Sequence, residues 1–181
     1  ADGSSKFAKG NRWGLFPAGA LAWRISNEDF LKDNQVVSNL KLRLSYGTSG
    51  NDRIDADLYQ KLYRVNSSRP AGWGEVSHYY YEFYNSKYVY NPDVKWETTI
   101  TRNIGLDFGF FNQRLTISPE FYINRSSNLL LNAKLPTSSG YNSMVINAGE
   151  TENKGFEVSL TWNAINTKNY GLTFSGNVGF N

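Results

Sequence analysis

The chain has 181 residues, with 19 Lys and Arg against 16 Asp and Glu, a net charge of +3, and a negative mean hydropathy although 40% of its residues are hydrophobic. Apolar and polar residues are therefore interleaved, and no run reaches the roughly 18 apolar residues of a spanning helix, so a membrane role would use strands. The basic residues are scattered among acidic ones, which argues against nucleic acid as a partner. The absence of cysteine excludes disulfides and thiol chemistry.

Two segments in the first part of the chain predict strands. Gly14–Ile25 combines apolar and small residues, and Ser26–Asp29 after it predicts a single capped helical turn. Leu40–Tyr46 alternates without an error between apolar and polar residues, which places its side chains on two faces. Over Gly47–Lys95 the alternation fails and turn residues recur, so we expect a long loop with room for short strands of its own.

The stretch Thr98–Arg125 predicts one long β-hairpin. Its first arm has an apolar face (Ile100, Ile104, Leu106, Phe108, Phe110) and a small or polar face (Thr99, Thr101, Asn103, Gly105, Asp107, Gly109). The chain turns at Asn112-Gln113, and pairing Phe111 with Arg114 brings the apolar residues of both arms to one face. Each arm has about 13 residues, against roughly five or six in a typical soluble strand. This length favours a transmembrane barrel strand.

Connections between the predicted strands alternate between short and long. Alternation fails over Ser126–Asn153 and returns at Phe156–Trp162 and Tyr170–Phe180, which a short break at Asn163–Asn169 separates. Outer-membrane barrels have short periplasmic turns and longer extracellular loops. We therefore expect residues 47–95 and 126–153 to be extracellular loops.

Short motifs over nearly the whole chain resemble those of one known family, in the family's order. They are Asp2–Phe7, Trp13–Ala18 with Leu21–Ser26, Leu42–Asn51, Asn91–Glu97, Asn103–Phe108 and Asn153–Glu157. The first reads Asp-Gly-Ser-Ser-Lys-Phe, and the fourth reads Asn-Pro-Asp-Val-Lys-Trp-Glu. Together they resemble the SusC/RagA-type TonB-dependent outer-membrane transporters of Bacteroidetes.

The resemblance implies both a fold and a function. A complete member has a barrel of about 22 strands and a plug, whereas residues 1–181 would be an all-β, antiparallel transmembrane β-barrel segment of about six long strands without the plug. The implied function is a share in importing large nutrients, oligosaccharides or peptides, by energy-coupled opening of the plug. The implied partners are outer-membrane lipid, a SusD-like surface lipoprotein and, through the plug region, the TonB complex. We expect a location in the cell outer membrane and no enzymatic activity, cofactor or metal.

The densest aromatic cluster lies in the longer expected loop. It comprises Trp73, Tyr79, Tyr80, Tyr81 and Tyr84. Aromatic rings pack against the C–H faces of sugars, so this loop is a candidate substrate contact. The alternative is that the rings pack the loop onto itself or line the lipid interface.

A second candidate set occupies the polar faces of the predicted strands. It comprises Asn103, Asp107, Glu120, Tyr122 and Glu157, which should face the lumen of a barrel. A polar interior is where water or the plug lies, so we expect these residues to have a structural role, with direct gating of substrate as the alternative.

Two other patterns lack the residues that their chemistry needs. His78 is the single histidine, and no G-x-S-x-G motif accompanies it, so we expect no catalytic triad. Asp52, Asp55 and Asp57 alternate, but the glycine and terminal Glu of an EF-hand are missing. We expect a solvated loop there, with a weak Ca²⁺ site as the alternative.

A soluble β-sandwich that binds carbohydrate through the same aromatic residues is the alternative function. It predicts shorter strands, apolar faces packed against each other and a monomer that is stable without detergent. The strand lengths and the alternation of short and long connections favour the barrel.

Overall fold

The computed structural model describes residues 1–32, 34, 36–73, 76–83 and 88–181, and only the backbone of 64–73 and 76–83. The strands are β1 (Asp2–Gly3), β2 (Trp13–Gly14), β3 (Ala18–Arg24), β4 (Val37–Asn51), β5 (Tyr63–Trp73), β6 (Val76–Phe83), β7 (Tyr88–Val89), β8 (Glu97–Phe110), β9 (Leu115–Ser127), β10 (Leu130–Lys134), β11 (Ser143–Asn147), β12 (Glu150–Asn166) and β13 (Gly171–Phe180). Two 3₁₀ turns are η1 (Ile25–Asn27) and η2 (Thr137–Ser139). No helix in the described part of the chain is long and apolar enough to cross a membrane.

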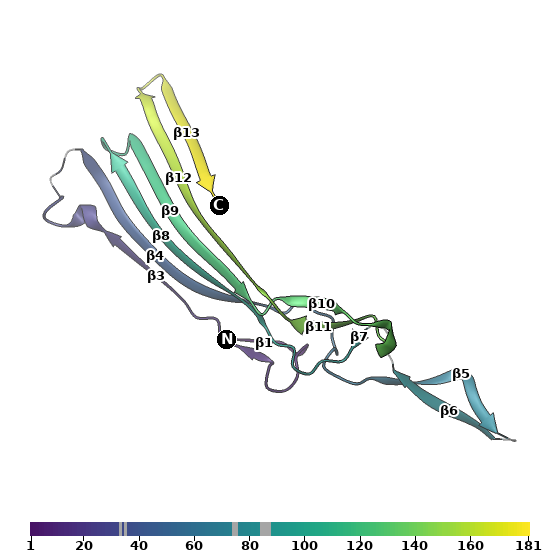
Figure 1. Cartoon of the computed structure of the whole chain (residues 1–181). Helices are drawn as coiled ribbons and strands as arrows, with labels where there is room; N and C mark the ends of the chain where they lie inside the picture. The colour runs from purple at the N-terminus through teal and green to yellow at the C-terminus, as the bar shows by residue number, and fades with distance from the viewer. Residues whose placement is uncertain (33, 35, 74–75, 84–87) are drawn as a thin grey trace. The chain divides into compact units, whose positions relative to one another are not determined.

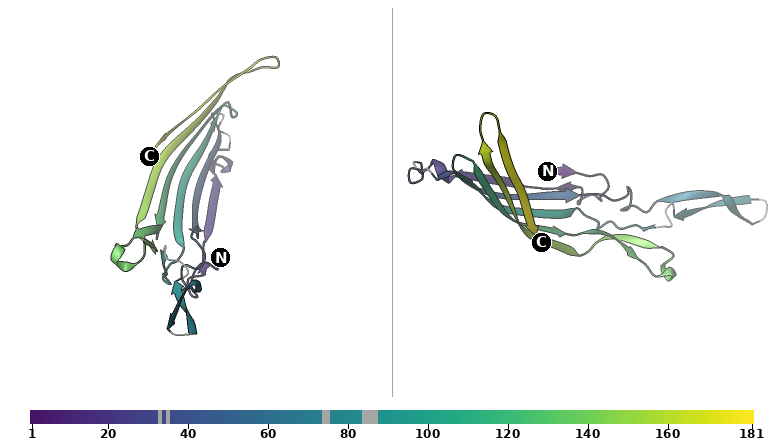
Figure 2. Two further views of the ribbon diagram at one scale, coloured as in Figure 1. Left: turned by 90° about the vertical axis from the view of Figure 1, so that its right-hand side faces the viewer. Right: turned by 90° about the horizontal axis from the view of Figure 1, so that it is seen from above.

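The chain divides into two units, of which unit 2 is a six-stranded sheet. Unit 2 comprises residues 16–49, 99–126 and 151–181, and its strand order is β13-β12-β9-β8-β4-β3. Figure 1 shows these strands side by side, and Figure 2 shows that the sheet is twisted. Strands β4, β8, β9 and β12 have 15, 14, 13 and 17 residues, and about 9–11 suffice for a tilted transmembrane strand. The predicted all-β, antiparallel architecture is confirmed, as an open sheet.

The hairpin of β8 and β9 has the predicted register. The Thr99 and Ser126 hydroxyls lie 2.7 Å apart, and the Ser127 hydroxyl donates to the Thr98 carbonyl at 3.4 Å. At the turn, the Arg114 N–H donates to the Phe111 carbonyl at 3.2 Å. All three contacts agree with the pairing of Phe111 with Arg114.

The other short connections of unit 2 also join antiparallel neighbours. Strand β3 pairs with β4, with Ala22 opposite Arg43, and β12 pairs with β13 through a register shift between Asn163 and Ile165. The sequence predicts Ser26–Asp29 as the cap of a helical turn, whereas the 3₁₀ turn η1 comprises Ile25–Asn27, so that Ser26 and Asn27 lie within the turn and no side chain caps it. The Trp23 indole N–H instead donates to Glu28 at 2.8 Å.

Unit 1 is built around a small apolar core. It comprises residues 1–15, 50–98 and 127–150, and its sheets are β1-β2, β10-β11-β7 and β5-β6. The core consists of Phe7, Leu58, Val94 and Val145, which are 0–7% exposed. These residues come from separate parts of the chain, so the core joins the N-terminal segment to both of the long connections that sequence alternation leaves unassigned.

Asparagine side chains link the backbone segments of unit 1. The Asn91 amide donates to the Val145 carbonyl at 2.8 Å. The Asn147 amide accepts from the Lys95 N–H and donates to the Lys95 carbonyl, both at 2.8 Å. The motif Asn91–Glu97 is thereby fixed against β11, because its backbone groups gain partners where no regular ladder supplies them.

We expect Phe7→Ala to open unit 1 locally. Removing a fully buried phenylalanine side chain costs about 3–5 kcal/mol, and here the ring also packs 5.3 Å from the ring of Trp96. Hydrogen exchange of the amides of residues 91–97 in the full receptor should accelerate by at least about a hundredfold. Phe30→Ala, at a residue that is 73% exposed, is the control. Unchanged exchange in the Phe7 variant would contradict this role of the core.

Candidate functional site

Arg43 on β4 joins three strands on the polar face of unit 2. Its Nε and Nη2 donate to the Asp107 carboxylate at 3.0 and 3.1 Å, and Nη1 and Nη2 donate to Glu120 at 3.2 Å. The guanidinium therefore connects β4 to β8 and β9. The three side chains are 26–37% exposed, and exposed ion pairs stabilise by at most about 1 kcal/mol. The fork-like contact with Asp107 and the second carboxylate make this cluster stronger than an isolated pair.

Gly105 provides the space for the Arg43 guanidinium. A Cβ atom at this buried position would lie 2.8 Å from Arg43 Nη2 and 3.0 Å from Cζ. Ala20 and Ala22 on the neighbouring β3 are also small, and together these residues border a hollow of ≈ 250 Å³ beside Arg43. Small residues around one cation thus leave it open on one side.

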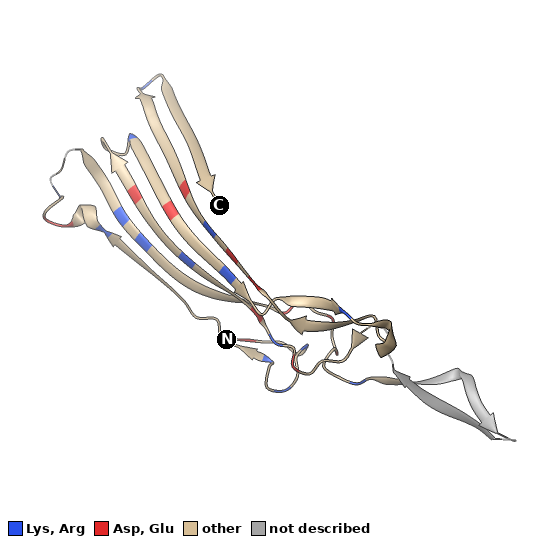
Figure 3. Ribbon diagram, viewed as in Figure 1, with Lys and Arg blue, Asp and Glu red and all other residues tan. Residues whose placement is uncertain are grey.

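Four of the predicted lumen-facing residues line a second open hollow of ≈ 320 Å³. They are Asn103, Glu120, Tyr122 and Glu157. Asp107, the fifth, connects to them through Arg43 and Glu120. Figure 3 shows the sparse charges along these strands. The structure therefore brings the five predicted residues to one face, and the prediction that they face a barrel lumen stays a prediction.

The second hollow is rich in hydrogen-bond acceptors. The Oδ1 atoms of Asn103 and Asn124 are shielded from solvent and accept no hydrogen bond from the described residues. The carboxylates of Glu120 and Glu157 lie in the same lining, which has no Lys or Arg among its described members. An unsatisfied buried acceptor costs about 1–3 kcal/mol, so this surface favours water or a partner that presents N–H or O–H groups.

Large apolar side chains occupy the opposite face of the sheet and are exposed. They are Leu21, Trp23, Leu44, Ile104, Phe121, Phe156, Leu160, Trp162 and Phe174, with exposed fractions of 37–60%. Each is adjacent in sequence to polar or small residues, as alternation along a strand requires. Soluble monomers rarely expose apolar patches of more than a few hundred Å². The β-sandwich alternative is thus disfavoured, because it needs this face to be buried against another sheet.

The predicted aromatic substrate contact falls largely outside the described residues. The backbone of Trp73 lies in β5 and that of Tyr79, Tyr80 and Tyr81 in β6, and these strands form an antiparallel hairpin. Their side chains, and all of Tyr84, lie outside the description. Contact with substrate at these positions stays a prediction.

The aspartates after β4 do not form a metal site in the described part of the chain. Asp52 accepts a hydrogen bond from the buried Ser4 hydroxyl at 2.8 Å, and Lys6 Nζ lies 3.8 Å from the same carboxylate. Among described residues, no group of three His, Cys, Asp or Glu side chains could hold a metal ion. Asp52 instead attaches the N-terminal segment to the end of β4.

Comparison with known proteins gives the family of this chain. Residues 1–181 match the family described as TonB dependent receptor-like, beta-barrel. The chain belongs to this family. It is 42% identical over 183 residues to TonB-dependent receptor SusC of Bacteroides thetaiotaomicron, covering 99% of this chain and 18% of SusC. A TonB-dependent receptor of Formosa agariphila is 35% identical over 184 residues, covering 99% of this chain and 16% of that receptor.

Solved structures show the same relationship. The RagAB peptide importer in the "closed-closed" state matches with a TM-score of 0.80 and 29% identity, covering 98% of this chain and 19% of the other. Its "open-open" state matches with a TM-score of 0.78 and 29% identity, covering 97% and 18%. The chain therefore spans less than a fifth of the length of these relatives.

Family membership explains the two faces of the sheet. TonB-dependent receptors of the SusC and RagA type are outer-membrane proteins, and this chain is an antiparallel segment of their β-barrel domain. In such a barrel an outward apolar band alternates with inward polar residues along each strand. The exposed apolar side chains and the Arg43 cluster fit this alternation.

Sequence reasoning placed Arg43 on a polar face but did not identify it as a site residue. The register of the hairpin already indicated a site for a cation. It places Glu120 on β9 opposite Gly105 on β8, and Asp107 follows Gly105 by two residues on the same face. Two carboxylates beside a glycine favour a neighbouring cation and leave space for it. The order of β4 next to β8, which supplies it, comes only from the structure.

We expect Gly105→Ala to destabilise the sheet by displacing Arg43 from the carboxylates. Overfilling a packed site typically costs about 1–3 kcal/mol. Gly176→Ala on β13 is the matched control, because a Cβ there meets no atom within 4 Å. The heat-induced loss of compact gel mobility of the full receptor should occur at a lower temperature in the Gly105 variant alone. Equal midpoints for the two variants would show that the guanidinium moves aside at no cost.

Proposed function

We propose that this chain forms part of the wall of an outer-membrane importer that takes up large nutrients, oligosaccharides or peptides, by energy-coupled opening of a plug. The observation that carries the proposal is the sheet with two chemically opposite faces. One face exposes apolar side chains from every part of the sheet, and the other holds the ion cluster of Arg43, Asp107 and Glu120. A wall between lipid and an aqueous interior requires this division.

The polar face is the lumenal face in this proposal. Its unpaired acceptors at Asn103 and Asn124 and the carboxylates of Glu120 and Glu157 would receive hydrogen bonds from water or from the plug. The residues of this face support and position, and they make or break no bond. The energy for opening the plug comes from the TonB complex, which acts through the plug region of the full receptor.

The long connections are the extracellular part in this proposal. Residues 47–95 and 126–153 contain three of the four core residues of unit 1 and its sheets β10-β11-β7 and β5-β6, whereas at the other ends of the strands residues 111–114 join β8 to β9 and residues 167–170 join β12 to β13. A SusD-like surface lipoprotein is the expected partner on this side. The chain matches the RagAB structures in the "closed-closed" and "open-open" states with nearly equal TM-scores of 0.80 and 0.78. Nearly equal scores are expected if the chain is a segment of the barrel wall.

Uptake should depend on the receptor and on the energised inner membrane together. We expect cells with the full receptor to accumulate a labelled oligosaccharide or peptide with saturable kinetics, and this uptake should stop when a protonophore collapses the proton gradient. Deletion of the receptor gene should give the same loss, and the plasmid-borne gene should restore uptake. Saturable uptake that survives the protonophore would contradict energy-coupled import.

A further inference from the structure

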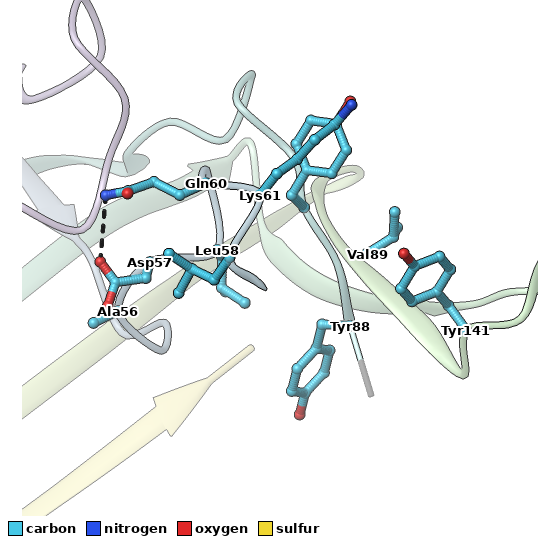
Figure 4. A pocket seen from close by; sticks show the side chains of 10 residues that line it. Ala56, Asp57, Leu58, Gln60, Lys61, Tyr88, Val89 and Tyr141 are labelled. Atoms are coloured by element: carbon cyan, nitrogen blue, oxygen red, sulfur yellow. Dashed lines mark hydrogen bonds between the residues drawn. The ribbon is translucent and has the colours of Figure 1, made fainter. Parts of the chain in front are cut away.

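The charged side chains of the small pocket in unit 1 already have partners. Figure 4 shows the Asp57 carboxylate accepting a hydrogen bond from the Gln60 amide, at 3.4 Å. The Lys61 ammonium covers the Tyr90 ring, 4.5 Å from its centroid. A ligand would have to displace these contacts. Three cations on the sheet of unit 2 are better placed to bind a charged group.

These cations lie on the apolar face of the sheet, toward the strand ends that lead to the long connections. They are exposed and come from three strands that are neighbours in the sheet, Arg102 on β8, Arg125 on β9 and Lys154 on β12 (Figure 3). Side chains two residues apart share a face of a strand. Each cation is two residues from an apolar side chain of that face, namely Ile104, Ile123 and Phe156.

Strand β12 pairs with β9 in one register between two contacts. At the turn end, the Asn163 N–H donates to the Arg114 carbonyl at 2.8 Å. Toward the other end, the space that Gly155 leaves holds the Tyr122 hydroxyl. Both contacts agree on which residues of the two strands lie opposite each other, so no slip separates them.

Ile123 lies at the centre of the three cations. In this register it is opposite Lys154, and in the hairpin register it is opposite Arg102. Arg125 is the next residue of β9 on the same face. Neighbouring strands lie about 4.8 Å apart, and two residues rise about 6.7 Å, so the Cα atoms of the cations lie within roughly 10 Å of one another. Side chains of this length can meet at a single anion.

Positive charge exceeds negative charge around Ile123. In the described part of the chain, no side chain pairs with the Arg102 guanidinium. Arg125 has an interaction within the chain, and Lys154 Nζ lies 3.9 Å from Glu152, with exposed fractions of 67% and 48%. Such an exposed pair contributes little, and arginine and lysine carry several N–H donors each. Three positive charges and the negative charge of Glu152 leave a net charge of +2.

The cations border the apolar band of the sheet. Between them and the turn ends of the strands, the apolar face carries no Lys, Arg, Asp or Glu in the described residues. The eight residues from Arg102 to Phe110 rise about 19 Å, at roughly 3.3 Å per residue and a tilt near 45°. This is most of the height of an outer-membrane apolar band, which is about 25 Å. Lipid headgroups begin at this level.

We propose that Arg102, Arg125 and Lys154 bind the phosphate of an outer-leaflet lipid, and that this lipid is lipid A. A guanidinium donates two parallel N–H groups to a phosphate, and a lysine adds a point charge. Ile123 and the apolar side chains beyond it contact the acyl chains. The inference rests on the proposed extracellular position of the long connections, which places these strand ends in the outer leaflet.

Solvation of each cation by water is the alternative. A long cationic side chain at the edge of a membrane can extend its charged end to water. Three such side chains on successive strands around one apolar residue repel one another, however, and a shared phosphate removes this repulsion. The two readings differ in whether binding depends on the phosphate of the lipid.

The test measures binding of lipid A to the full receptor in a neutral detergent, by titration followed with native mass spectrometry. We expect the Kd to rise at least about tenfold in the triple variant Arg102→Gln, Arg125→Gln, Lys154→Gln. Lipid A without its phosphates should bind the unchanged receptor about as weakly as lipid A binds this variant.

A matched control removes the same charge at the other ends of the strands. It is the triple variant Arg24→Gln, Lys32→Gln, Lys168→Gln, at exposed residues. Its Kd for lipid A should stay within about twofold of that of the receptor. Inorganic phosphate alone should not raise the heat stability of the receptor, whereas lipid A should.

Two results would overturn the proposal. One is an equal Kd for the receptor and the first triple variant, with both equally heat-stable in detergent. The other is equal stabilisation by inorganic phosphate, or tighter binding of phosphatidylglycerol than of lipid A. If the triple variant does not fold, Arg102→Gln alone should raise the Kd about threefold, and an unchanged Kd would likewise contradict the site.

Failure of this inference is distinguishable from failure of the proposed function. All of these binding results leave energy-coupled import unaffected, because none of them measures uptake. Loss of energy dependence in the uptake assay would overturn the proposed function, and it would leave the binding of lipid A in detergent as it is.

Discussion

The structure depends on one constraint, which is that side chains alternate across an extended strand. Strands β4, β8, β9 and β12 have 13–17 residues, and over much of this length apolar and polar side chains alternate, so each strand has one mainly apolar and one mainly polar face. Neighbouring strands in register then combine these into the two faces of the sheet. A single-residue slip would exchange the faces, so the register is strongly specified. In an outer-membrane barrel this alternation separates lipid from water within one layer of backbone.

On the polar face, alternation places charged side chains of neighbouring strands close together. The carboxylates of Asp107 and Glu120 would repel each other without a cation. Arg43 lies between them because Gly105 has no side chain. A similar arrangement recurs at Gly155, whose missing Cβ leaves space for the Tyr122 ring and hydroxyl. At both positions, the absence of a glycine side chain allows a side chain from a neighbouring strand to approach the backbone closely.

Unit 1 is organised by a different principle. It has few buried apolar residues, and its strands are mostly short, so amide side chains such as Asn91 and Asn147 complete the backbone hydrogen bonding. Such pairings join residues about 50 positions apart and leave no period in the sequence. For this reason alternation predicted the six strands of the sheet, the hairpin register and the polar residues of its face. It did not predict β10 and β11 or the partner of Asp107, because these depend on contacts between distant segments.

The division of the sheet into a lipid face and an aqueous face is tested most directly by single cysteines along β8. Because the chain has no cysteine, one can be placed in turn at Thr101, Asn103, Ile104, Asp107 and Phe108 of the full receptor, after removal of any others. Intact outer membranes would then be treated with a membrane-impermeant maleimide. The account predicts labelling at 101, 103 and 107 and protection at 104 and 108. Labelling without this alternation, or with the opposite phase, would contradict it.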